Sequence, residues 1–133
     1  MDLDPSVNLN TPSAKSQPDW SACLQACQDC AEACRRCLDA CKAGANADMM
    51  AECMKLDFEC AAVCDAKVQL LSRAPAANPN DVAAQMAKCA DACGACATEC
   101  ESHAKMMEHC GVCAEACREC EAACKDAMAG KAA

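Results

Sequence analysis

Six cysteines recur at alternating intervals of four and three residues in the stretch CLQACQDCAEACRRCLDAC, which runs from Cys23 to Cys41. These intervals place side chains on one face of an α-helix, where leucine ordinarily forms the buried stripe. A thiolate is a nucleophile, a redox group and a soft metal ligand. The stretch therefore predicts a helix whose buried face carries thiol chemistry.

The other cysteines continue this spacing in three further segments of the chain. The chain has eighteen cysteines in all, each at an equivalent position of a helical repeat. We therefore expect all of them to face the interior and to bind metal. They are Cys23, Cys27, Cys30, Cys34, Cys37, Cys41, Cys53, Cys60, Cys64, Cys89, Cys93, Cys96, Cys100, Cys110, Cys113, Cys117, Cys120 and Cys124.

Several other uses of buried thiols fit this pattern poorly. Cysteine can be a small core residue, but eighteen thiols make a weakly cohesive core. Disulfides are disfavoured because thiols along one regular helix do not face each other as partners. Structural zinc sites usually place paired CxxC units on turns. The chain has no CxxCH haem motif and no iron–sulfur run ending in Cys-Pro.

Cu(I) is the metal that best suits many inward-facing thiolates. It is soft, monovalent and satisfied by few sulfur ligands. Eighteen thiolates in a core of low dielectric constant need compensating positive charge. If each thiolate bridges two ions and each ion binds two sulfur atoms, the core is neutral with about eighteen Cu(I) ions. The sequence therefore predicts a capacity near one ion per cysteine.

The fold that positions these residues is predicted to be all-α, an antiparallel up-down-up-down four-helix bundle with a cysteine-lined core. Residues 1–17 have the composition of a disordered polar tail, and residues 18–129 form the bundle. Glycine, proline and N-cap residues mark the boundaries. A single helix across residue 105 would leave its apolar face uncovered, so we expect a turn there. The predicted helices cover residues 18–43, 46–73, 80–104 and 106–129.

Histidine and methionine side chains gather at one end of this predicted bundle. The loop after the first helix and the turn after the third lie at the same end. His103 continues the cysteine spacing and His109 lies beside it, so we expect both as copper ligands. Thioether sulfur binds Cu(I) more weakly than thiolate, which suits a mouth that acquires copper. The auxiliary residues expected there are Met49, Met50, Met54, Met106 and Met107.

Other side chains complete the two ends of the core. Asp57 occupies the helical position between Cys53 and Cys60. It can accept a hydrogen bond from a thiol, bind metal near the mouth or rotate outward, and the spacing leaves all three open. The opposite end collects apolar residues that we expect to form a dry plug. They are Trp20, Val68, Leu71, Val82, Met86 and Met128.

Charge and composition exclude several classes of protein. The net charge is −8, and the chain has no basic stripe that could neutralise phosphates, which argues against a nucleic-acid-binding protein. No apolar run is long enough to span a membrane. The first 17 residues have neither the basic nor the apolar region of a secretory signal. We therefore expect a cytoplasmic location, where thiols stay reduced.

The cysteine pattern resembles that of the bacterial copper storage proteins, in their cytosolic branch. The resemblance rests on CxxxCxxCxxxCxxCxxxC at Cys23–Cys41, CxxxCxxCxxxC at Cys89–Cys100, then His103, and MEHCxxCxxxCxxCxxxC at Met107–Cys124. It implies a four-helix bundle that binds many Cu(I) ions through cysteine, and a homotetramer of such bundles. The second helix departs from the dense pattern, with only Cys53, Cys60 and Cys64.

The predicted function is non-enzymatic storage or sequestration of Cu(I), with copper ions as cargo. Copper chaperones or efflux components are the expected protein partners. Two alternatives remain open at this point. One is a metallothionein-like zinc or cadmium buffer, and the other is a thiol redox protein. The redox alternative requires one exposed, activated CxxC, and no CxxC in the chain stands out as such.

Overall fold

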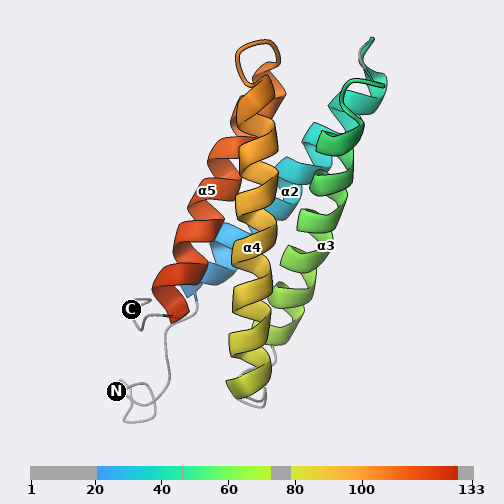
Figure 1. Ribbon diagram of the computed structural model, residues 1–133. Coiled ribbons are helices and arrows are strands. Elements are labelled where there is room, and N and C mark those ends of the chain that lie inside the picture. Colours follow the sequence, from blue (N-terminus) through green and yellow to red (C-terminus); the bar gives the residue numbers. More distant parts are fainter. Residues whose placement is uncertain (1–20, 46, 73–78, 129–133) are drawn as a thin grey trace, which may run out of the picture.

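The protein is described by a computed structural model that covers residues 21–45, 47–72 and 79–128. These residues form four helices, α2 (Ser21–Ala43), α3 (Ala51–Ser72), α4 (Pro79–His103) and α5 (Glu108–Met128) (Figure 1). Alanine and the unbranched residues that fill them are strong helix formers. The described part of the chain contains no strand.

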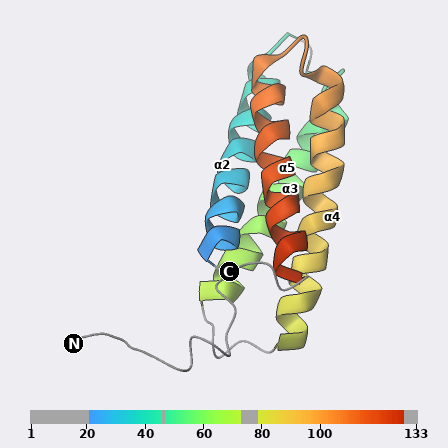
Figure 2. The same ribbon diagram turned by 90° about the vertical axis from the view of Figure 1, so that its left-hand side faces the viewer.

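The helices form an up-down-up-down bundle, as the sequence predicts. α2 packs against α3 and α5, and α4 packs against the same two helices, so the four enclose one central core. Consecutive helices run in opposite directions (Figures 1 and 2). The connection between α2 and α3 therefore lies at the same end as the turn between α4 and α5.

The helix boundaries differ from the predicted ones by a few residues. α3 begins at Ala51 and not near residue 46, because residues 47–50 form a turn in which Met50 N–H donates to the Ala47 carbonyl (3.1 Å). α4 begins at Pro79, one residue before the expected start. Proline suits the first helical position because its missing N–H would have no helical partner there. The predicted tail and Trp20 lie outside the described residues.

The turn between α4 and α5 is present where the sequence predicts a break. The His103 carbonyl accepts hydrogen bonds from the backbone N–H groups of Met106 (3.1 Å) and Met107 (2.9 Å). α5 starts at Glu108. The two cysteine-rich halves of the C-terminal region are thereby folded back on each other, and α4 and α5 cover each other's apolar faces.

The core of the bundle is built from cysteine, a few alanines and very few large apolar residues. Leu71, Val82 and Met86 are buried at the end away from the α4–α5 turn, as expected for the plug. Met128 is 46% exposed, so it does not belong to that plug. The plug is not wholly apolar either, because the fully buried Lys67 lies near it. No helix in the described part of the chain combines the length and apolar character needed to cross a membrane.

Candidate metal centre

All eighteen cysteines are buried inside the bundle. The most exposed of them, Cys41, has a relative accessibility of 2%. Every one is a free thiol. We call this set of side chains the sulfur core. The helical spacing produces it because positions three and four residues apart return to the same face on each of the four helices.

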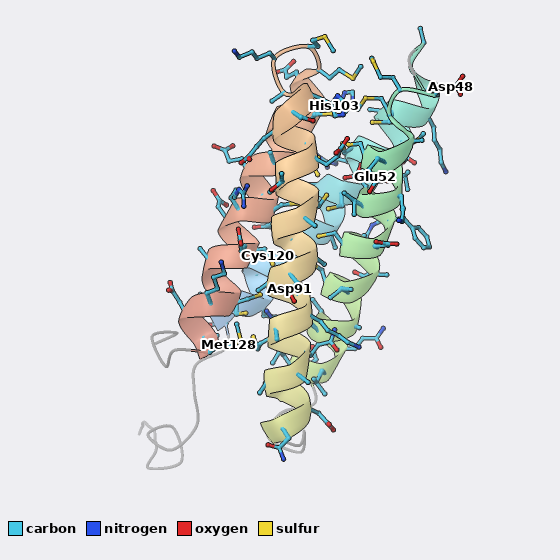
Figure 3. All side chains as sticks on the ribbon, in the orientation of Figure 1. Asp48, Glu52, Asp91, His103, Cys120 and Met128 are labelled. Atoms are coloured by element: carbon cyan, nitrogen blue, oxygen red, sulfur yellow. The ribbon has the colours of Figure 1, made fainter. Side chains whose placement is uncertain are left out.

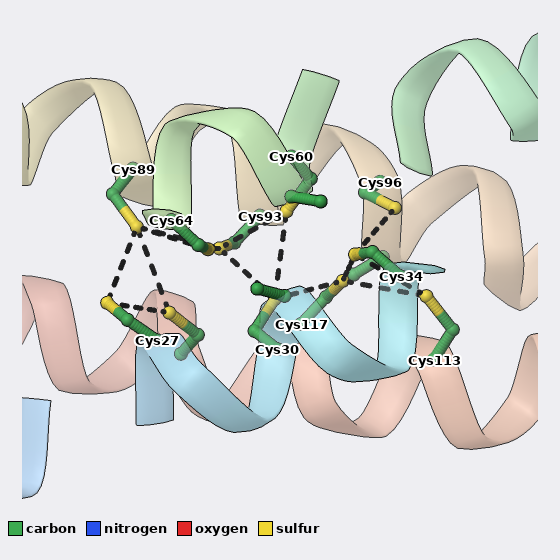
Figure 4. Close-up of a cluster of buried hydrophobic side chains, with 14 of the residues drawn as sticks. Cys27, Cys30, Cys34, Cys60, Cys64, Cys89, Cys93, Cys96, Cys113 and Cys117 are labelled. Atoms are coloured by element: carbon green, nitrogen blue, oxygen red, sulfur yellow. Dashed lines mark hydrogen bonds between the residues drawn. The ribbon is translucent and has the colours of Figure 1, made fainter. Parts of the chain in front are cut away.

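At the middle of the sulfur core, one cysteine from each helix meets the others (Figure 4). The Sγ of Cys30 on α2 lies 3.6 Å from that of Cys60 on α3 and 3.7 Å from that of Cys93 on α4. It also lies 3.6 Å from the Sγ of Cys117 on α5. All four helices therefore contribute sulfur to a single cluster.

Sulfur contacts extend from this centre in both directions along the bundle. Toward the plug, Cys27 Sγ lies 3.6 Å from Cys120 Sγ, and Cys64 Sγ lies 3.7 Å from Cys89 Sγ. Toward the α4–α5 turn, the sulfur atoms of Cys34 and Cys117 are 3.7 Å apart. Those of Cys53 and Cys100 are 3.6 Å apart. The thiols thus form a continuous column and not separate sites.

Within the column, several sets of four side chains could each hold a metal ion. In each set the potential ligand atoms all lie within 4.8 Å of one another. The four sets made only of cysteine share members with their neighbours, so ions bound in adjacent ones would share bridging sulfur. They include Cys27/Cys89/Cys120/Cys124, Cys30/Cys64/Cys93/Cys120, Cys30/Cys34/Cys60/Cys117, Cys34/Cys96/Cys113/Cys117 and Cys37/Cys41/Cys110/His109.

His109 joins the sulfur core at the end that holds the α4–α5 turn. Its Nε2 lies 3.4 Å from Cys41 Sγ, and the ring is half-buried. Beside it is a pocket of about 290 Å³ whose lining includes Met50, Met106 and Met107. We call these three methionines and His109 the His/Met end. It places thioether and imidazole groups next to the outermost thiols.

His103 lies at the same end but makes a different contact (Figure 3). Its Nε2 is 2.9 Å from a carboxylate oxygen of Glu99, one turn earlier on α4. The sequence made His103 the direct continuation of the cysteine spacing and placed His109 beside it. In the structure, His109 is the one that contacts a thiol, and His103 stays a predicted ligand.

The remaining predicted auxiliary residues differ in exposure. Met50 is buried at 1% and Met107 is partly buried, whereas Met106 is 68% exposed. Met49 is also exposed, and the partly buried Met54 packs against the core. The structure therefore gives the methionines a graded arrangement from solvent toward the thiols. Their role as copper ligands stays a prediction.

Asp57 points into the sulfur core and accepts hydrogen bonds from thiols. Its side chain is fully buried. Cys96 donates to it at 3.2 Å and Cys113 at 3.4 Å. Burial is the largest cause that raises the pKa of Asp57, to about 10. Of the three roles left open by the spacing, the structure shows the hydrogen-bond acceptor.

Lys67 is a core residue that the sequence analysis missed. It is fully buried, and its Nζ lies 2.6 Å from Cys124 Sγ. The signal was present in the spacing, because Cys60, Cys64, Lys67 and Leu71 follow one another at intervals of four, three and four. On the inward face of α3, Asp57 and Lys67 therefore occupy two positions at which the other helices carry cysteine.

Two thiols at the His/Met end, those of Cys41 and Cys110, have raised pKa values that favour their neutral form in the absence of metal. Burial is the largest cause that raises the pKa of Cys41 to about 11 and that of Cys110 to about 12. Metal binding requires the thiolate form. An ion that binds here must therefore displace protons, so its apparent affinity rises with pH.

Comparison with known proteins agrees with this geometry. The sequence profile of the copper storage protein family matches residues 16–129. The chain belongs to the copper storage protein family. No curated protein sequence matches it. The family match covers all four helices and every cysteine of the sulfur core.

Solved structures of copper storage proteins share the bundle. A cytosolic one from Streptomyces lividans, described with five coppers, is 44% identical, with a TM-score of 0.81 over 83% of this chain and 92% of that chain. The Streptomyces protein loaded with ten copper equivalents is 41% identical, with a TM-score of 0.84 over 90% and 93%. Cu(I)-bound copper storage protein 3 of Bacillus subtilis is 36% identical, with a TM-score of 0.73 over 80% and 95%.

Proposed function

We propose that this copper storage protein holds Cu(I) in the cytosol as a non-enzymatic store, with a capacity near one ion per cysteine. The observation that carries the proposal is the continuous column of eighteen buried free thiols. Thiolate is the ligand that soft Cu(I) prefers. The column offers far more sulfur than a single structural ion requires.

The sharing of cysteines between neighbouring sets supports a high capacity. Cys30, Cys34, Cys117 and Cys120 each belong to two of the four-ligand sets. A sulfur that bridges two ions spreads its charge over both, so about one monovalent ion per thiolate neutralises the core. The related Bacillus protein is described as Cu(I)-bound, and the Streptomyces protein is described as loaded with ten copper equivalents, which supports copper as the cargo here.

We infer that copper passes through the His/Met end. His109 and the outermost thiol, Cys41, both line the pocket beside the turn, and they contact each other. Thioether and imidazole ligands hold Cu(I) less tightly than thiolate, so they favour transfer in either direction. His103 and the exposed Met49 and Met106 would act nearer to solvent. The plugged end offers no comparable set of weak ligands among the described residues.

The assembly and the protein partners are proposed from the family resemblance. We infer a homotetramer of bundles, with copper chaperones or efflux components as donors and acceptors of copper. Phe58 on α3 is 67% exposed and Val112 on α5 is 57% exposed. Single exposed apolar side chains are common on monomers, so the proposed tetramer rests on the family resemblance. Sedimentation would measure the assembly directly.

Metal analysis of the protein isolated without oxygen from copper-fed cells tests the proposed function. We expect many copper ions per chain and the luminescence of Cu(I)–thiolate clusters. Colourless protein that carries zinc or cadmium under the same conditions would favour the metallothionein-like buffer. Catalytic disulfide turnover by one thiol of depressed pKa would favour the redox alternative, which the burial of every cysteine disfavours.

A further inference from the structure

Lys67 is a charged side chain enclosed by the sulfur core. Its relative accessibility is 0%, and it is the largest of the fully buried side chains. It lies near the C-terminal end of α3, so it occupies the half of the core away from the His/Met end. Copper binding explains the buried cysteines, but it does not explain why a lysine occupies an inward position of α3 where the spacing would place a cysteine.

The partners of the Lys67 ammonium are sulfur atoms. Its Nζ donates to Cys124 Sγ at 2.6 Å. Burial lowers the pKa of an ammonium group, but hydrogen bonds to Cys124 and Cys23 outweigh it, so the net shift in the pKa of Lys67 is upward. The side chain therefore stands among the thiols as a fixed positive charge.

Cys124 is also a member of a four-sulfur set that could hold metal. Its partners in that set are Cys27, Cys89 and Cys120, and all four sulfur atoms lie within 4.8 Å of one another. A cation at hydrogen-bond distance from one of these sulfurs has the same electrostatic role there as a bound Cu(I) ion. It also repels a second cation placed next to it, since the core screens charge weakly.

We propose that Lys67 is a resident cation of the sulfur core that takes the place of one copper ion beside Cys124. The inference rests on the proposed function. With one ammonium already present, the eighteen thiolates of a loaded core reach neutrality with about one Cu(I) ion fewer than they otherwise would. The difference of one ion is independent of the protonation of Asp57, because Asp57 is the same in both cases.

The copper capacity of matched variants tests this proposal. Lys67→Leu removes the charge and adds no metal ligand. Lys67→Arg keeps the charge at the same position. Lys55→Leu removes an exposed lysine from the same helix and serves as the control. Native mass spectrometry of anaerobic, copper-saturated protein counts the ions bound to each chain.

We expect the fully loaded Lys67→Leu species to carry one more Cu(I) ion than the wild type. Lys67→Arg and Lys55→Leu should match the wild type. An unchanged capacity in a helical Lys67→Leu variant would overturn the inference while leaving the storage function intact. Saturation of the wild-type protein at four ions or fewer would instead overturn the storage function, and the inference with it.

A second measurement does not depend on the folding of any variant. Anomalous scattering from crystals of the copper-loaded wild-type protein locates each ion. We expect the Lys67 ammonium to stay within the core beside Cys124, with no copper ion at the position that it fills. A Lys67 side chain directed to solvent, with copper bound in its place, would contradict the proposal.

Discussion

The imidazole Nε2 of His109 lies 3.4 Å from the Sγ of Cys41. The two residues belong to the first and the last of the four helices. Cys41 lies near the end of α2, and His109 lies in the first turn of α5. Their contact joins the outermost thiol to the pocket lined by Met50, Met106 and Met107. It is the point at which the sulfur core meets weaker copper ligands.

This contact predicts that His109→Ala slows copper uptake. Loss of an imidazole beside the first thiols should lower the initial uptake rate roughly tenfold. This is the lower end of the loss in affinity or activity that follows removal of a group that supports a metal site. The thiols remain, so the final capacity should fall by no more than one ion. Stopped-flow mixing with a Cu(I)–chelator complex measures the rate.

His103→Ala is the matched control, because that imidazole contacts Glu99 and not a thiol. It should slow uptake less than His109→Ala does. Equal rates in the wild type and the His109→Ala variant would show that copper reaches the core by another route.

Asp57 should make the metal-free protein less stable as the pH rises. Its pKa is about 10 in the folded protein, against an ordinary value of 3.8. Between these values the unfolded chain has lost a proton that the folded chain retains. The free energy of unfolding therefore falls with rising pH, by up to about 1.4 kcal/mol per pH unit from this group.

Asp57→Asn should remove this contribution, since the amide has no proton to lose in this range. Its oxygen can still accept hydrogen bonds from Cys96 and Cys113. We would measure the free energy of unfolding in urea for reduced, metal-free protein at pH 5, 7 and 9. The stability of the variant relative to the wild type should increase at each step in pH. Parallel pH profiles for the two proteins would refute the assignment of a protonated Asp57.

Cysteines in the middle of the column should matter more for capacity than those at its end. Cys30 contacts sulfur atoms from all three other helices, and it belongs to two four-ligand sets. Cys23 lies at the plug, where its thiol donates to the thioether sulfur of Met86 at 3.8 Å. Each substitution removes one sulfur, and that of Cys30 joins two of the four-ligand sets.

Cys30→Ala should therefore lose about two Cu(I) ions, and Cys23→Ala about one at most. Native mass spectrometry of saturated protein gives both counts. Identical losses from the two positions would contradict a greater share of bridging sulfur in the middle of the column.

Copper binding should raise the stability of the bundle. The sulfur core lacks the large apolar side chains that stabilise most helical bundles, and metal bonds between helices would replace them. A ligand that binds only the folded state at one hundred times its Kd adds about 2.7 kcal/mol for each independent site. Thermal unfolding should therefore shift upward with each equivalent of Cu(I). A Tm that does not respond to copper would contradict a metal-filled core.

The sequence predicted the fold and the sulfur core because both depend on a single regular feature. Intervals of three and four residues determine which face of each helix is buried, and cysteine marks that face unmistakably. The same rule would have found Lys67 from its spacing after Cys60 and Cys64. It was missed because a lysine is almost never fully buried without a partner, and the partner, Cys124, lies 57 residues away in the sequence.

The choice between the two histidines could not be made from spacing. His103 is the last residue of α4 and His109 lies in the first turn of α5. Their orientations depend on the geometry of the turn between them, which helical spacing does not describe. Glu99, one turn before His103, offers that ring a carboxylate partner. The sequence contains this pair, but only the structure shows that it forms.

Cu(I) titration of the reduced protein, without oxygen and against a competing chelator, tests the central claim most directly. The sulfur core predicts saturation at about seventeen or eighteen ions per chain, with every thiol protected from alkylation at the end point. Saturation at four ions or fewer, with most of the eighteen thiols still reactive after unfolding, would contradict the storage of copper in this core.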